Sequence, residues 1–142
     1  RSMVITGDIK AGVIWAGVVA SYPDMFTRWR RGTGSSLTAT PSPRSWRFSL
    51  MQAYGSPEEN PAFWSSISAN SYLRDLSGPI QLHHGTADED VPLEFSELLF
   101  YQMLEADQFV ELYKYEGDNH NISNYFSQAM QRTIEFFDRY VK

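Results

Sequence analysis

The chain has 142 residues, of which 42% are hydrophobic and 15% aromatic, and its formal net charge is −5. This size and composition are typical of one soluble α/β domain, and we expect a single domain over residues 1–142. The absence of cysteine excludes disulfides, thiolate metal sites and a cysteine nucleophile, and no apolar stretch is long enough to span a membrane. The cellular compartment stays open, and we expect no cofactor.

Positive charge is concentrated in one part of this acidic chain. No acid lies between Asp24 and Glu58, and that stretch contains Arg28, Arg30, Arg31, Arg44 and Arg47. The pattern predicts a solvated surface loop beside an acidic body, with recognition of an anionic ligand as the alternative. So short a basic patch on an acidic protein argues against nucleic acid as a partner.

The first half of the chain contains one clear strand signal. Residues 11–19 are apolar without alternation, which predicts a strand buried on both faces of a parallel sheet. From Tyr22 to about Tyr54 the pattern is rich in Arg, Ser, Thr, Gly and Pro, so we expect a long irregular segment. Residues 56–59, Ser-Pro-Glu-Glu, then have the form of a helix N-terminus.

The second half alternates strands and helices. Strands are expected at 79–84 and 109–115, the latter nearer a sheet edge, and helices are expected from Pro92 and from about Ser123. Each helix has one apolar face. These faces consist of Phe95, Leu98, Leu99 and Met103 in the first helix, and of Phe126, Met130, Thr133, Ile134, Phe137 and Val141 in the second. The order predicts an α/β fold, a parallel sheet with covering helices.

Two loops carry the strongest chemical signal. Residues 84–92 and 116–121 each follow an expected strand, and they contain Asp88 and His120. If the two strands are parallel neighbours, both side chains leave the carboxyl edge of the sheet, where open α/β folds place their sites. A carboxylate that holds Nδ1–H of an imidazole leaves Nε2 free to take a proton from a hydroxyl nucleophile. Taken singly, each residue also fits a plain polar turn.

The third member of such a triad is missing from the sequence. A nucleophilic serine in a Gly-x-Ser-x-Gly turn occurs nowhere, and the closest approach, residues 34–38, lacks the second glycine and follows no strand. The adjacent His83 and His84 point to opposite faces of a strand, which argues against a shared metal site and favours structural packing for both.

The two loops resemble segments of the prolyl oligopeptidase family, α/β-hydrolase serine peptidases that include dipeptidyl and acylaminoacyl peptidases. His-Gly-Thr-Ala-Asp at 84–88, followed by Val91 and Pro92, resembles the segment with the triad aspartate, and Asp-Asn-His at 118–120 resembles the segment with the triad histidine. The likeness is clear over residues 60–142 and poor across 24–54. Among the nearby acids, which include Glu89, Asp90 and Asp118, the resemblance selects Asp88.

The resemblance implies that the chain is the C-terminal part of an α/β-hydrolase domain whose serine lies upstream. It also implies that residues 24–54 form a cap-like insertion, and that the strand at 11–19 has an open edge able to pair with another chain, including a second copy. The leading hypothesis is a peptidase acting on a peptide or acyl substrate through Asp88 and His120, with the isolated chain inactive. The alternatives are a carboxylic ester hydrolase, a noncatalytic interaction module and an inactive fragment.

Overall fold

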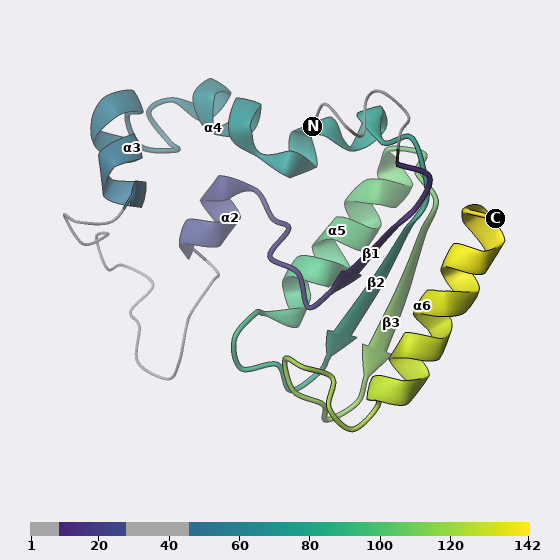
Figure 1. Ribbon diagram of the computed structural model, residues 1–142. Coiled ribbons are helices and arrows are strands. Elements are labelled where there is room, and N and C mark those ends of the chain that lie inside the picture. The colour runs from purple at the N-terminus through teal and green to yellow at the C-terminus, as the bar shows by residue number, and fades with distance from the viewer. Residues whose placement is uncertain (1–8, 28–45) are drawn as a thin grey trace.

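The computed structural model describes residues 9–27 and 46–142. Three parallel strands form one sheet, with a helix on each face (Figure 1). Along the chain the elements are β1 (Gly12–Trp15), α2 (Tyr22–Thr27), α3 (Trp46–Tyr54), α4 (Pro61–Ile67), the 3-10 helix η1 (Ala69–Asp75), β2 (Ile80–Gly85), α5 (Leu93–Glu105), β3 (Val110–Tyr115) and α6 (Phe126–Tyr140). The expected α/β class is confirmed.

The central strand β2 is the best buried part of the sheet. It pairs with β1 from Gly12 opposite Ile80, and with β3 from Ile80 opposite Val110. Five of its six residues are buried, as expected for a strand with neighbours on both sides and helices on both faces. The predictions for β2 and β3 were each correct to within one residue. Because all three strands run the same way, their carboxyl ends meet at one edge of the sheet.

Helix α5 covers one face and supplies most of the core. It begins after Pro92, as predicted, and buries Phe95, Leu99 and Met103. Leu99 and Met103 pack with Leu82 of β2, whereas Leu98 of the predicted stripe is only partly buried. None of the described helices is long and apolar enough to cross a membrane.

Helix α6 covers the opposite face, but not with the residues that the pattern predicted. It starts at Phe126, three residues later than expected, and buries Ala129 and Phe136. The predicted apolar face is largely solvent-exposed in the described part of the chain: this holds for Phe126, Met130, Ile134, Phe137 and Val141. Of that face, Thr133 turns toward the sheet and accepts a hydrogen bond from the Trp15 indole. The helix is therefore rotated relative to the prediction, so that Ala129, Thr133 and Phe136 are turned inward.

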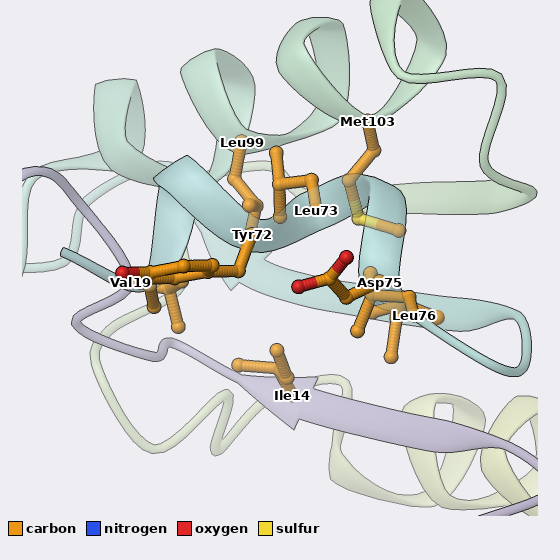
Figure 2. A pocket seen from close by; sticks show the side chains of 10 residues that line it. Ile14, Val19, Tyr72, Leu73, Asp75, Leu76, Leu99 and Met103 are labelled. Carbon is orange, nitrogen blue, oxygen red and sulfur yellow. The ribbon is translucent and has the colours of Figure 1, made fainter. Parts of the chain in front are cut away.

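Strand β1 is shorter and less buried than predicted. It ends at Trp15 because Ala16 adopts a left-handed conformation with φ 44°, and all four strand residues are only half-buried. Within the described residues β1 pairs with β2 alone, so its other edge is open. Beside it lies an apolar hollow of about 200 Å³. Figure 2 shows Ile14 of β1 facing Leu73 of η1 and Met103 of α5 across this hollow.

The segment expected to be irregular contains two helices, α2 and α3, while residues 28–45 lie outside the described part. The helix expected at residue 56 was placed too early. Ser56 and Glu59 cap each other's backbone N–H groups, but this closes a single turn, and α4 begins only after Asn60, whose side chain accepts from the Phe63 N–H. The 3-10 helix η1 was not predicted.

Candidate active site

The loop after β2 holds Asp88 with its carboxylate buried. Oδ1 accepts hydrogen bonds from the backbone N–H groups of Asp90, at 2.8 Å, and Val91, at 2.9 Å. These two bonds form an Asx turn that fixes the side-chain rotamer. The other oxygen, Oδ2, is thereby aimed away from its own loop and is left for partners from elsewhere in the fold.

The loop after β3 brings His120 to that oxygen. Nδ1 of His120 lies 2.9 Å from Oδ2 of Asp88, and the imidazole side chain is 34% exposed whereas the carboxylate side chain is fully buried. Among the described residues, Nε2 of His120 has no hydrogen-bond partner. Because an ionised carboxylate can only accept, this geometry places the proton of a neutral imidazole on Nδ1. Nε2 then has an open lone pair that is able to accept a proton.

The other carboxylates near the two loops do not contact the His120 ring. Glu89 and Asp90 are exposed, and Asp118 is fully buried. Only Asp88 therefore meets His120 within the part of the chain that the structure describes. In the same part, no group of three or more His, Cys, Asp or Glu side chains is arranged to hold a metal ion.

Asp118 organises the loop that carries the histidine. Its carboxylate accepts backbone N–H groups from Asn119, Asn124 and Tyr125, as well as the Asn124 side-chain amide. Burial alone would raise the pKa of Asp118, but the N–H donors of Asn124, Tyr125 and Asn119 outweigh it and hold the pKa below its usual value. The buried anion ties the His120 loop to the start of α6.

Ile122 anchors the same loop from the other side. Its side chain is fully buried against Tyr115 and Ala129, although its backbone has φ 51°, a conformation that β-branched residues rarely adopt. Such a residue costs about 1–3 kcal/mol in backbone strain. The strained conformation persists because burial of the Ile122 side chain, two residues after His120, leaves the loop little freedom to relax.

The two loops are joined by backbone contacts at their base. The Thr86 N–H donates to the Tyr115 carbonyl, the Gly117 N–H donates to the Thr86 hydroxyl, and the Ala87 N–H donates to the Asp118 carbonyl. These bonds require close approach at Gly85, where a Cβ atom would lie 2.3 Å from the Asp118 carbonyl oxygen. Glycine is needed here for space, and not for a positive φ.

Replacing Gly85 by alanine is therefore expected to destabilise the protein by about 1–3 kcal/mol, because the added methyl group meets backbone that has no room to yield. Urea unfolding followed by circular dichroism would measure the loss. The matched control is Gly117→Asn, since Gly117 has φ 68° with no atom near its missing Cβ, and asparagine tolerates that conformation. Equal stability of Gly85→Ala and the parent chain would contradict the packing described here.

His83 belongs to a buried polar chain that the sequence did not reveal. The Gln81 amide donates to Glu111 at 2.8 Å, so the Gln81 oxygen faces Nε2 of His83, at 2.7 Å. Nε2 is thus the protonated nitrogen, and Nδ1 accepts from the Tyr115 hydroxyl at 2.7 Å. Arg132 in turn donates to the Tyr115 oxygen. Burial, followed by the nearby Arg132 cation, lowers the pKa of His83 to about 4.

His84 points to the opposite face, as predicted, and reaches the candidate site. It is fully buried, with Nδ1 2.7 Å from the Ser96 hydroxyl and Nε2 3.0 Å from the Val91 carbonyl oxygen. Nε2 also lies 3.1 Å from Oδ2 of Asp88. The sequence interpretation of His84 as structural packing missed this contact. Its one signal was the spacing of four residues between His84 and Asp88 across a tight turn.

Comparisons with known proteins agree with this fold. The fold matches a putative dipeptidyl aminopeptidase IV from Bacteroides ovatus with TM-score 0.64 and 15% identity, covering 97% of this chain and 17% of that one. It matches an acylaminoacyl peptidase from Pyrococcus horikoshii with TM-score 0.63 and 20% identity, over 96% and 21% of the two chains. Est1E from Butyrivibrio proteoclasticus gives TM-score 0.64 and 18% identity, over 97% and 54%. At these identities the likeness concerns the fold.

The chain thus spans about a fifth of the length of the two peptidases it matches. A search of curated protein sequences gave no match. The profile that describes the prolyl oligopeptidase family matches residues 10–142, which is nearly the whole chain and includes both site loops. The chain belongs to the prolyl oligopeptidase family.

Proposed function

We propose that this chain is the C-terminal portion of a serine hydrolase, a peptidase of the prolyl oligopeptidase type, in which Asp88 and His120 complete a Ser-Asp-His triad. The nucleophilic serine comes from sequence upstream of residue 1. The observation that carries the proposal is the 2.9 Å contact between Asp88 Oδ2 and His120 Nδ1, with Nε2 of the partly exposed imidazole left open.

The geometry suits a double proton transfer. Nε2 of His120 takes the proton from the serine hydroxyl as its oxygen attacks the scissile carbonyl carbon, which forms a tetrahedral intermediate. The imidazolium then gives that proton to the leaving amine as the C–N bond breaks, leaving an acyl-enzyme. Water repeats both steps to release the acid and the free serine. Asp88 stays ionised throughout and stabilises the imidazolium.

Three features of the described residues support a larger hydrolase domain around this chain. β1 has an open edge, the hollow beside it is lined mainly by apolar side chains, and α6 exposes an apolar face. Monomeric proteins rarely leave such surfaces uncovered. Further strands and helices of the same domain, placed against β1 and α6, would bury all three.

Labelling with a fluorophosphonate probe tests the proposal in the longer protein. The expected result is one labelled serine in a Gly-x-Ser-x-Gly turn upstream of residue 1, identified by peptide mapping, with labelling lost in His120→Gln. No labelled serine, or labelling that is unaffected by His120→Gln, would overturn the triad. Hydrolysis of matched peptide and ester substrates then separates the peptidase from a carboxylic ester hydrolase.

The open edge of β1 favours one further candidate, a noncatalytic interaction module. In that case a partner strand would add to β1 and complete the sheet without any chemistry at Asp88 and His120. Sedimentation of the 142-residue chain distinguishes the two. A tight complex that leaves both site residues dispensable would favour the module, whereas a monomer would argue against it.

A further inference from the structure

Two oxygen atoms lie close to one ring nitrogen of His84. The Val91 carbonyl oxygen and Oδ2 of Asp88 lie 3.0 and 3.1 Å from Nε2. A carbonyl oxygen cannot donate, so Nε2 must carry a proton, which is bonded to the Val91 carbonyl and lies close to the Asp88 carboxylate. Nδ1 of the neutral ring then accepts from the Ser96 hydroxyl at 2.7 Å. The tautomer of this buried imidazole follows from its partners alone.

The carboxylate of Asp88 is consequently surrounded by donors. Oδ1 accepts the N–H groups of Asp90 and Val91, Oδ2 accepts Nδ1–H of His120, and Nε2 of His84 lies 3.1 Å from Oδ2. Oδ2 is the oxygen on which the candidate triad depends. Of its two imidazole partners, His84 is fully buried, whereas the His120 side chain is 34% exposed. The buried partner is therefore the one able to fix the position of this oxygen.

We propose that His84 is a positioning residue, whose protonated Nε2, 3.1 Å from Oδ2 of Asp88, attracts this oxygen and keeps it in line with Nδ1–H of His120. Ser96 of α5 contacts Nδ1 on the other side of the ring and ties β2 to the helix, a structural role separate from the contact of Nε2 with Asp88. The inference rests on the proposed function for its effect on catalysis. The contact itself belongs to the folded chain and can be tested without a nucleophile.

Two substitutions at residue 84 test the contacts of Nδ1 and Nε2 separately. Glutamine places an amide N–H near the position of Nε2 but offers no acceptor to Ser96. Asparagine reaches only as far as Nδ1, so it keeps the Ser96 contact and loses the donor to Asp88. In the longer, serine-bearing protein, we expect His84→Asn to lower kcat on the order of 10²-fold with KM unchanged, because a misplaced catalytic group costs about this much. His84→Gln should retain most of the wild-type kcat.

A purely structural role predicts another result. If His84 serves only to anchor the strand to α5, then His84→Gln and Ser96→Ala should be the more damaging changes, and both should lower the melting temperature. Equal losses of kcat in His84→Asn and His84→Gln, matched by equal losses of thermal stability, would also overturn the proposal. The kinetic order of the two variants therefore decides between positioning and packing.

Nitrogen NMR of the histidine rings gives a readout that does not depend on the proposed function. The 142-residue chain has three histidines, so its ring spectrum is simple to assign. His84→Asn should lower the fraction of His120 with its proton on Nδ1, and His84→Gln should preserve it. An unchanged His120 tautomer in both variants would sink the positioning role. Absence of a labelled serine, by contrast, would refute the hydrolase and leave this result standing.

Discussion

Replacing Asp88 by asparagine is expected to lower kcat by about 10⁴-fold in the serine-bearing protein, with little change in KM. The reason is the tautomer of His120. Its Nδ1–H donates to Oδ2 of Asp88 at 2.9 Å, and an amide NH₂ at that position would offer a donor where an acceptor is needed. The imidazole would respond by moving its proton to Nε2. A protonated Nε2 cannot take the proton of a serine hydroxyl.

The fold should survive this substitution. The remaining amide oxygen can still accept the N–H groups of Asp90 and Val91, as Oδ1 does now. His84 keeps its bond to the Val91 carbonyl, but its Nε2–H would face the new amide nitrogen from 3.1 Å, so a small loss of stability is expected. Loss of activity in a variant that circular dichroism shows to be folded at the assay temperature would thus report on chemistry and not on unfolding.

Glu89→Gln is the matched control, because it removes one negative charge from an exposed position in the same loop. Steady-state kinetics on a peptide substrate would compare the two variants with the parent protein. Glu89→Gln should behave as wild type. Equal activity of Asp88→Asn and Glu89→Gln would show that Asp88 is not the acid of the triad, whatever its distance from His120.

The sequence was sufficient to place the two loops, and the reason is topological. A buried central strand with an apolar run, followed by a helix and a second strand, has few alternatives to a parallel sheet. Once β2 and β3 are parallel neighbours, Asp88 and His120 must leave the same edge. The topology therefore predicts that the two side chains lie close together, and the structure places them 2.9 Å apart, although their chemical role stays a prediction.

The contacts that hold this pair in place were beyond the sequence. Asp118 shapes the His120 loop through its buried carboxylate, and Ile122 does so through its left-handed backbone. No local sequence pattern predicts either feature. The sequence predicts structural packing for His84, because adjacent strand residues point to opposite faces and this argues against a metal site shared with His83. The contact of His84 with Asp88 depends on how the turn after β2 folds back, which is a tertiary property.

The apolar face of α6 failed as a prediction for a different reason. A 3.6-residue pattern identifies the face of a helix that prefers burial, but it does not say which surface will cover it. Within the described residues, the sheet instead meets Ala129 and Phe136, while Ile134 is 54% exposed. This mismatch is what a helix with a second packing partner would produce, and it supports the proposal of a larger domain.

Acidification from pH 6.5 to 4 is expected to lower the free energy of unfolding by about 3 kcal/mol through His83 alone. The ring is fully buried, and burial followed by the Arg132 cation lowers the pKa of His83 from 6.5 to about 4. Between these values the unfolded chain binds a proton that the folded chain does not. Stability therefore falls as the pH falls, by about 1.4 kcal/mol for each unit of pKa difference.

The limits of the window follow from the same linkage. Above pH 6.5 both states have a neutral His83, and below pH 4 both are protonated, so the contribution of His83 is flat outside these bounds. Urea unfolding at steps of half a pH unit from pH 7 to pH 4 would trace the change of stability with pH. The midpoint and the denaturant dependence of each unfolding curve give the free energy of unfolding. The chain contains two further histidines, His84 and His120, so a variant is needed to assign the pH dependence to the His83 ring.

His83→Gln provides that variant. Glutamine keeps a donor toward the Gln81 oxygen and has no titrating group, so the variant should be less stable at pH 7, where the acceptor for the Tyr115 hydroxyl is lost. Its stability should then fall less steeply on acidification, and the two curves should converge toward pH 4. Parallel curves would mean that His83 is not held neutral by burial. Convergence would identify the hydrogen-bonded chain from Glu111 to Arg132 as the acid-sensitive part of the core, on the face of the sheet opposite Asp88.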